Sequence, residues 1–127
     1  MSDEVKRFFT SILNKVNGLN CVLISDRDGV PLLKLSKDNK FPELGTKQSF
    51  LSTFSIATVQ SSKMMLGKNK QIILCYKSST IVQLNKAPLI ITFVGTESTN
   101  IGHLLTYANE VDKYLEEYKI VLEQNLI

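Results

Sequence analysis

The chain has 127 residues, of which 43% are hydrophobic and 21% are charged, so it is too apolar to be intrinsically disordered and long enough to form one core. Its net charge of +3 comes from lysines and arginines scattered among acidic residues, and the sequence has no basic block of the kind that follows a nucleic-acid backbone. These values predict a single domain over residues 1–127 and argue against nucleic-acid binding.

The sequence also limits the compartment in which we expect the chain. The amino terminus, Met-Ser-Asp-Glu, lacks the apolar h-region of a signal peptide. Cys21 and Cys75 lie in apolar runs with strand character, where a thiol is usually buried, so we expect free thiols in a reducing compartment. The apolar run at 88–95 is too short to cross a bilayer. Any location at a membrane is therefore expected to depend on a partner.

The first element is predicted to be a helix. Ser2 or Asp3 can cap its start, and Gly18 follows its end. Six apolar residues recur at spacings of three and four, as on one face of a helix: Val5, Phe8, Phe9, Ile12, Leu13 and Val16.

A β-hairpin is predicted next. Residues 20–25 and 30–35 form two apolar runs of strand length, and the turn residues at 26–29 (DRDG) join them. Pro31 cannot donate a ladder hydrogen bond. The second strand is therefore expected to lie at a sheet edge or to begin just after the proline.

An uncharged helix is predicted in the middle of the chain. Turn-forming residues at 36–47 lead into 48–62, which contains no charged side chain and has apolar residues at helical spacing, and Gly67 is expected to end the helix. Ile56 and Val59 fall outside the main apolar stripe, so the apolar arc is too wide for a helix with one side in water. Because one sheet covers only one side, we expect a protein partner on the second side.

Three further strands and a terminal helix complete the pattern. Residues 71–77, 80–85 and 89–95 are apolar runs whose links are short enough only for antiparallel neighbours. One face of a single helix of about six turns collects eight residues: Ile101, Leu104, Leu105, Ala108, Val111, Leu115, Tyr118 and Leu122. The order α-β-β-α-β-β-β-α predicts an α+β fold built on one antiparallel sheet.

The turn at 26–29 has a second interpretation. Asp26 and Asp28, followed by Gly29 and Val30, match the first motif of haloacid-dehalogenase-type phosphatases, where the two aspartates would be nucleophile and general acid. That chemistry also needs Mg²⁺ held by acidic residues after another strand. No acidic pair follows 89–95, and hairpin-length links exclude a doubly wound parallel sheet. The sequence therefore favours a hairpin turn, with a small phosphatase as the less favoured alternative.

Other candidate sites are weak. Lys63, Lys68 and Lys70 form either a patch for an acidic partner or a solvated helix end with a favourable dipole interaction, and we favour the helix end. His103 is the only histidine, which excludes a histidine-based metal site or dyad. We expect no catalytic residue, cofactor or metal.

Four blocks of sequence resemble a known family: VLISDRDGVPLLKL at 22–35, FLSTFSIAT at 50–58, SKMMLGKNKQII at 62–73 and VQLNKAPLIITF at 82–93. In this order and at this spacing, they resemble the MAP-kinase scaffold subunits of the Ragulator complex, which have the roadblock fold shared with dynein light chains. The resemblance is weaker over 36–48 and in the terminal helix. It implies a five-stranded antiparallel sheet with the first and third helices on one face and the middle helix on the other.

The resemblance also implies a heterodimer with a second roadblock subunit, formed through the middle helix and the third strand. The residues implied in this interface are Phe50, Leu51, Phe54, Ala57, Thr58, Ser61, Met65, Gln71, Ile72, Ile73, Leu74, Cys75 and Tyr76. The family further implies a lipidated Ragulator anchor subunit, other Ragulator subunits, Rag GTPases recruited for the TOR kinase pathway, and a MAP-kinase kinase and MAP kinase as clients. The implied location is the cytoplasmic face of the late endosome or lysosome, reached through partners.

We therefore expect a non-catalytic scaffold. The alternative within the same fold is a self-dimerising roadblock module of a motor or GTPase-regulating complex.

Overall fold

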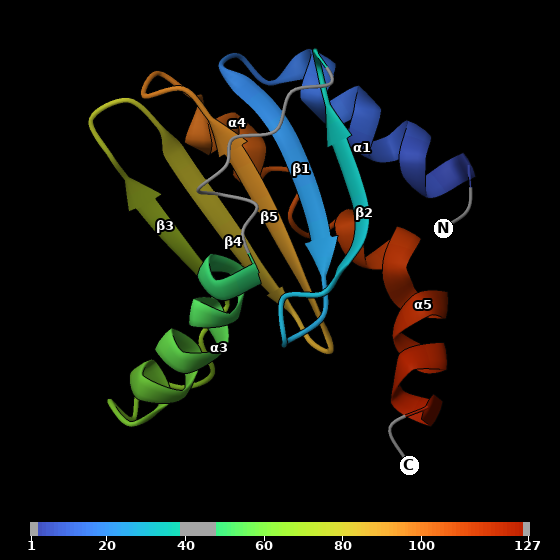
Figure 1. The fold of residues 1–127 in the computed structure, drawn as a ribbon, viewed down its shortest axis with the longest axis vertical. Coiled ribbons are helices and arrows are strands. Elements are labelled where there is room, and N and C mark those ends of the chain that lie inside the picture. Colours follow the sequence, from blue (N-terminus) through green and yellow to red (C-terminus); the bar gives the residue numbers. More distant parts are fainter. Residues whose placement is uncertain (1–2, 39–47, 126–127) are drawn as a thin grey trace.

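The computed structural model describes residues 3–38 and 48–125 and contains one five-stranded antiparallel sheet. The strands are β1 (Leu19–Ser25), β2 (Pro31–Ser36), β3 (Gln71–Cys75), β4 (Thr80–Lys86) and β5 (Leu89–Gly95). Their order across the sheet is β2-β1-β5-β4-β3, so β2 and β3 are the two edges (Figure 1). The predicted strands and their antiparallel arrangement are confirmed, and β2 begins at Pro31 on an edge, as its proline required.

Helices lie on both faces of the sheet. Figure 1 shows α3 (Gln48–Ser62) on one side, and α1 (Asp3–Lys15), α4 (Ile101–Leu105) and α5 (Val111–Asn125) on the other. The main core forms between the sheet and the helices α1, α4 and α5. There Phe9 of α1 packs near Phe93 of β5 with ring centroids 6.3 Å apart. The helix arrangement therefore follows the one that the family resemblance implied.

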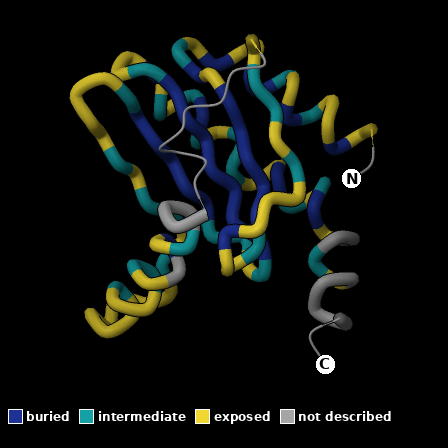
Figure 2. Tube along the Cα trace, viewed as in Figure 1, coloured by how far each residue is buried: buried dark blue, intermediate teal, exposed yellow. Residues whose placement is uncertain are grey.

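The central strands are buried on both faces, which explains why their sequences are continuously apolar. All seven residues of β5 are buried, as are six of the seven in β1 (Figure 2). Successive residues along these strands point to opposite faces of the sheet and belong to two different hydrophobic clusters. One contains Val22 and Phe93 beneath the helices, and the other contains Cys21 and Val94 on the α3 side.

The terminal helix differs from the prediction of one continuous helix, because the chain forms α4, a series of turns and then α5. At the break, the amide nitrogens of Thr106, Tyr107 and Ala108 each bond a carbonyl three residues back, and the Thr106 hydroxyl bonds the carbonyl of His103 at 2.6 Å. This hydroxyl competes with the helical hydrogen-bond pattern. The apolar face is nevertheless used for packing, since Leu104, Val111 and Leu115 are buried.

The middle helix also ends earlier than Gly67, the predicted end. The hydroxyls of Ser61 and Ser62 both donate to the carbonyl of Thr58, at 3.0 and 2.9 Å. The next amides, at 63–65, bond three residues back instead of four. The helix therefore unwinds into turns after Ser62.

The two cysteines lie in different environments. Cys21 is buried on the α3 side of the sheet, as expected, and burial raises the pKa of its thiol to about 11. Cys75 is exposed, so its expected burial is wrong for the isolated chain. The apolar run around Cys75 belongs to an edge strand, and an edge strand lacks a neighbour on one side.

Candidate functional site

The α3 helix projects away from the sheet instead of lying flat on it (Figure 1). Phe54 attaches the helix to its own domain, since only 2% of its surface is exposed. Phe54 and Thr58 line a cavity of about 290 Å³ together with Ala87 and Ile90 of the β4–β5 region. Beyond this attachment the helix is increasingly open to solvent (Figure 2).

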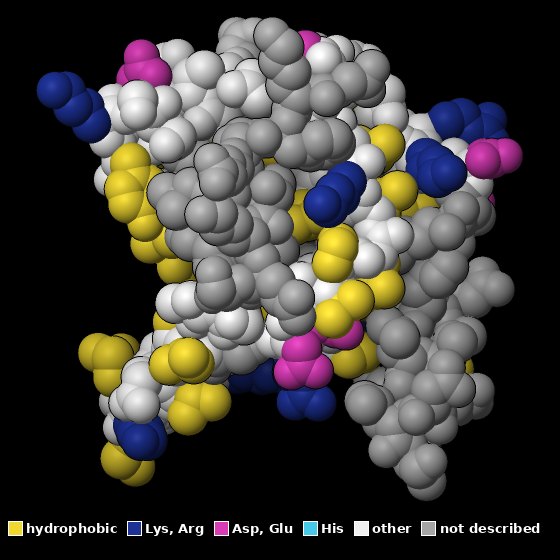
Figure 3. Space-filling model, in the orientation of Figure 1, with side chains coloured by type: hydrophobic (Ala, Val, Ile, Leu, Met, Phe, Trp, Pro, Cys, Tyr) yellow, Lys and Arg dark blue, Asp and Glu magenta, His cyan; other side chains and the backbone are white. Residues whose placement is uncertain are grey.

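The outward side of α3 and the turn after it expose large apolar side chains. Ile56 is 63% exposed and Met65 is 91% exposed, and Val59, Met64 and Leu66 are also exposed. Figure 3 shows hydrophobic and lysine side chains together on this projection. An apolar surface of this kind on a helix typically marks a site of association. We call the outward side of α3 with this turn, together with the free edge of β3, the docking surface.

The free edge of β3 is the second part of the docking surface. The amide of Asn85 donates to the carbonyl of Lys70 and the amide of Tyr76 donates to the carbonyl of Ser79, which fixes the hydrogen-bond alternation along the β3–β4 ladder. The amides and carbonyls of Gln71, Ile73 and Cys75 consequently point away from β4. This edge offers an antiparallel ladder to an incoming strand.

Of the residues implied in the interface, the structure brings some together and leaves others undetermined. The backbone of Phe50 and Leu51 is part of α3, but the structure does not describe their side chains. Ala57, Thr58 and Ser61 are half-buried, and Met65 lies on the turn after the helix. On β3, Leu74 packs toward the α3 side, whereas Ile73 and Tyr76 are exposed.

Four exposed large apolar residues of the docking surface are absent from the predicted set: Ile56, Val59, Met64 and Leu66. The family resemblance implied that the stripe through Phe54 contacts the partner, yet Phe54 is buried within its own chain. The sequence held part of the signal for these four residues, because every side of α3 lacks charge. Which side faces the domain depends on tertiary packing, and helical periodicity alone does not determine it.

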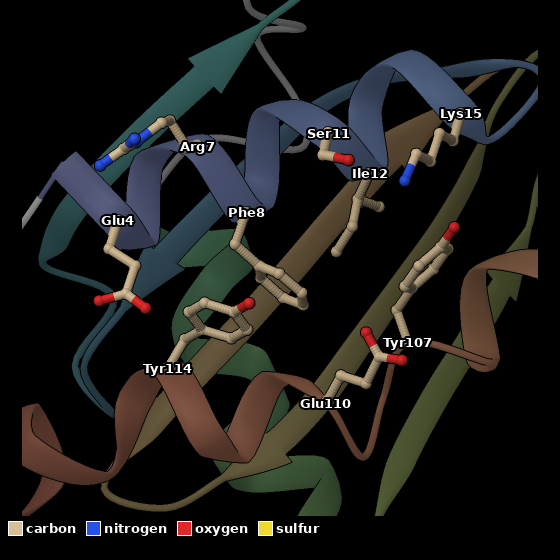
Figure 4. Close-up of a pocket in the computed structure, with 9 residues that line it drawn as sticks. All are labelled: Glu4, Arg7, Phe8, Ser11, Ile12, Lys15, Tyr107, Glu110 and Tyr114. Atoms are coloured by element: carbon tan, nitrogen blue, oxygen red, sulfur yellow. The ribbon is translucent and has the colours of Figure 1, made fainter.

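A groove of about 530 Å³ separates α1 from α5 on the opposite face of the sheet. Phe8 stacks on Tyr114 within it, with ring centroids 4.0 Å apart, and Tyr107 points into the same space (Figure 4). Its charged margin carries both signs, since Arg7 lies near one end and Glu110 near the middle. This mixture of charges does not indicate one class of ligand.

The turn at 26–29 is a hairpin turn. The amide of Gly29 donates to the carbonyl of Asp26 at 3.1 Å, and Gly29 adopts φ +85°, which suits a three-residue hairpin loop that ends in a left-handed glycine. One carboxylate oxygen of Asp26, Oδ1, accepts the amides of Asp28 and Val30 at 2.9 and 3.0 Å. Over the described residues, no cluster of three metal-ligating side chains occurs. The carboxylate of Asp26 therefore organises the turn.

Replacing Asp26 with alanine is expected to lower the free energy of unfolding by about 1 kcal/mol, because two backbone amides lose their acceptor. Asp26→Asn retains Oδ1 and is the matched control, with near-parental stability. Urea unfolding of both variants measures the difference. Assembly with partners should be unchanged in the double variant Asp26→Asn with Asp28→Asn. Phosphatase activity in the parent chain that disappears in this variant would instead support an enzyme.

Comparison with known proteins identifies close relatives. A family model described as mitogen-activated protein kinase kinase 1 interacting matches residues 3–122. The Ragulator complex protein LAMTOR3 homolog of Drosophila melanogaster is 48% identical over 119 residues, covering 94% of this chain and 95% of the relative. Ragulator complex protein LAMTOR3 of Homo sapiens is 42% identical over 123 residues, covering 97% and 98%.

Solved structures share the fold at low identity. MglB with a tetrameric arrangement has a TM-score of 0.77 at 14% identity, covering 92% of this chain and 88% of its own. The Roadblock/LC7 domain from Streptomyces avermitilis has a TM-score of 0.67 at 10% identity, covering 86% and 92%. At such identities the likeness concerns the fold alone, and it confirms the roadblock fold expected from the sequence.

Proposed function

The chain belongs to the mitogen-activated protein kinase kinase 1 interacting family, and from this premise we propose that it is a scaffold subunit forming one half of a roadblock heterodimer. Its relatives are named as proteins of the Ragulator complex, and this agrees with the non-catalytic adaptor role expected from the sequence. The second subunit would cover the docking surface, which includes Met65, Ile73 and Cys75 of the expected interface but not Phe54, which is buried within its own chain.

The observation that carries this proposal is that an exposed apolar helix side and an open strand edge occur in the same region of the chain. The α3 helix leads through residues 63–70 directly into β3. Burial of apolar side chains supplies most of the favourable free energy of association, and strand pairing fixes the register. One roadblock partner could satisfy both needs at once.

The finer assignments rest on the family. We propose a lipidated anchor subunit and other Ragulator subunits as partners, Rag GTPases as recruited proteins for TOR signalling, and a MAP-kinase kinase and MAP kinase as clients. The proposed location is the cytoplasmic face of late endosomes or lysosomes. Among the helices in the described ranges, none has the length and apolar character needed to cross a bilayer.

Replacing Ile73 with proline is expected to weaken pairing with the second subunit at least about tenfold, because the amide lost is one that points away from β4. Ile73→Thr keeps the amide and is the matched control. Ile72→Pro, by contrast, removes a bond to β4 and should destabilise the isolated chain. Pull-down titrations together with circular dichroism distinguish these effects. Full association of a folded Ile73→Pro variant would exclude β3 from the interface.

The most direct test of the proposed function is to copurify the native complex and identify the second roadblock chain by mass spectrometry. Sizing of the chain expressed alone addresses the alternative of a self-dimerising module. A tight symmetric dimer of the isolated chain, with no second roadblock protein in the native complex, would favour that alternative over the heterodimer.

A further inference from the structure

The charges of the chain are strongly segregated along the sequence. Residues 48–95, which include α3, β3, β4 and β5, contain five lysines and no aspartate or glutamate. Because the whole chain has a net charge of +3, the remaining residues carry a net charge of −2. The elements that form the docking surface are therefore cationic, whereas the rest of the chain is slightly acidic.

Four of these lysines flank the docking surface. Lys63, Lys68 and Lys70 are exposed on the turn between α3 and β3, and Lys77 is exposed just beyond the other end of β3. The fifth, Lys86, lies elsewhere and forms a 3.3 Å ion pair with Asp112. Within the ranges 3–38 and 48–125, no carboxylate forms an ion pair with any of the four flanking lysines, which we call the cationic rim.

Two lysines of the cationic rim lie beside exposed apolar side chains. A hollow of about 310 Å³ is bordered by Met64 and Leu66 together with Lys68 and Lys70. A partner surface with an apolar residue beside a carboxylate would satisfy both kinds of group. Charges around an apolar centre mainly determine which partner is chosen and how fast it associates.

Pairing of two copies would bring the cationic rims together. In a two-fold pair, the free edges of β3 would run antiparallel, and each surface would contact its own copy. With the two-fold axis at Ile73, Lys77 lies opposite position 69 of the other copy, between Lys68 and Lys70 of that copy. The same elements supply no carboxylate to compensate. Like charges in a partly desolvated seam oppose association.

We propose that the cationic rim prevents this chain from pairing with itself and selects a second subunit whose matching surface is acidic. This inference rests on the proposed function and adds the chemistry of the partner to it. It also revises the interpretation of Lys63, Lys68 and Lys70 as a solvated helix end, because all three lie beside the apolar surface that a partner would cover.

The first test uses the full-length chain alone. The variant with Lys63→Glu, Lys68→Glu, Lys70→Glu and Lys77→Glu reverses the rim. At moderate salt, the parent and the rim-reversed variant should each be monomeric by analytical ultracentrifugation. Their mixture should form a one-to-one pair at least about tenfold tighter than either self-pair, because Lys77 of one copy then meets glutamates of the other. A stable parental dimer, or a mixture that does not pair, would overturn the proposal.

The second test uses the copurified second subunit. Its association rate with the parent should fall about tenfold or more between low and high NaCl, and rim reversal should slow it by a similar factor. The control variant carries Lys6→Glu, Lys15→Glu, Lys37→Glu and Lys113→Glu, which give the same charge change outside the docking surface. This control should retain nearly the parental rate.

The outcomes separate this inference from the proposed function. If the second subunit binds at a rate that neither salt nor rim reversal changes, the heterodimer stands and the charge selection is wrong. If no second roadblock subunit is captured, the proposed function itself fails. An anionic membrane is the other surface that lysines of this kind bind. Phosphatidylcholine vesicles containing about 30% phosphatidylserine test this alternative. Rim-dependent binding of the assembled pair to these vesicles would assign the lysines to a membrane and overturn the protein assignment.

Discussion

Replacing Ile56 with aspartate is expected to weaken binding of the second subunit at least about 100-fold, which corresponds to about 3 kcal/mol. Ile56 is 63% exposed in the isolated chain and lies on the outward side of α3. In the proposed heterodimer this side is excluded from water, so the substitution would place an unpaired carboxylate in an apolar seam. Isothermal titration or surface plasmon resonance with the copurified subunit measures the loss.

The matched control for this experiment is Ile120→Asp. Ile120 is also a helical isoleucine, 48% exposed, but it lies on α5, away from the docking surface. Both variants should unfold at nearly the parental urea concentration, because each changes a side chain that is already in water. Equal binding by the Ile56 and Ile120 variants would remove α3 from the interface.

The comparison with Phe54 shows why exposure decides the choice of residue. From the sequence, Phe54→Asp is expected to cost several kcal/mol of association by placing a charge in the seam. In the structure, Phe54 is buried within its own chain, so this variant would also destabilise the fold and α3 would lose its attachment. Loss of binding by Phe54→Asp therefore does not identify an interface, whereas loss of binding by Ile56→Asp does.

The largest effect on folding is expected from Phe93→Ala, which should lower the free energy of unfolding by about 3–5 kcal/mol. Phe93 is fully buried in the centre of the sheet and packs near Phe9 of α1. Truncation would leave a cavity between the sheet and the helices, where close packing gives neighbouring groups little freedom to fill it. Urea unfolding followed by circular dichroism provides the measurement.

Phe8→Ala is the matched control for Phe93→Ala. Phe8 is half-buried at the groove, stacks on Tyr114 and meets the Phe9 ring edge-on, so its truncation removes these two aromatic contacts without opening the core. We expect a loss of about 1 kcal/mol. If the two variants lose the same stability, the packing of α1 on β5 is not the main source of stability that the structure indicates.

The sheet could be predicted well because its physical signals are local. Apolar runs with short turns mark strands, and the links at 26–30 and 76–79 are too short for any arrangement but antiparallel neighbours. Helix ends were predicted less well. The hydroxyls of Ser62 and Thr106 bond nearby carbonyls and shorten or interrupt their helices, and apolar periodicity carries no information about this competition.

The sequence could predict that a partner covers the middle helix, but it predicted only some of the residues at that site. The absence of charge from 48–62 indicated that more than one side of the helix would be covered. The sequence did not show that Phe54 packs on its own domain while Ile56 faces outward, because this depends on how the helix packs on its own domain. The open edge of β3 likewise follows from strand order, which propensities do not determine.

Amide hydrogen exchange at the free edge of β3 tests the central claim most directly. The amides of Ile73 and Cys75 point away from β4, so they should exchange rapidly in the isolated chain, whereas those of Ile72 and Leu74 are already protected. On assembly with the second subunit, exchange at Ile73 and Cys75 should slow at least about 100-fold. Equally rapid exchange at both amides in the free and assembled chain would contradict the proposed docking surface.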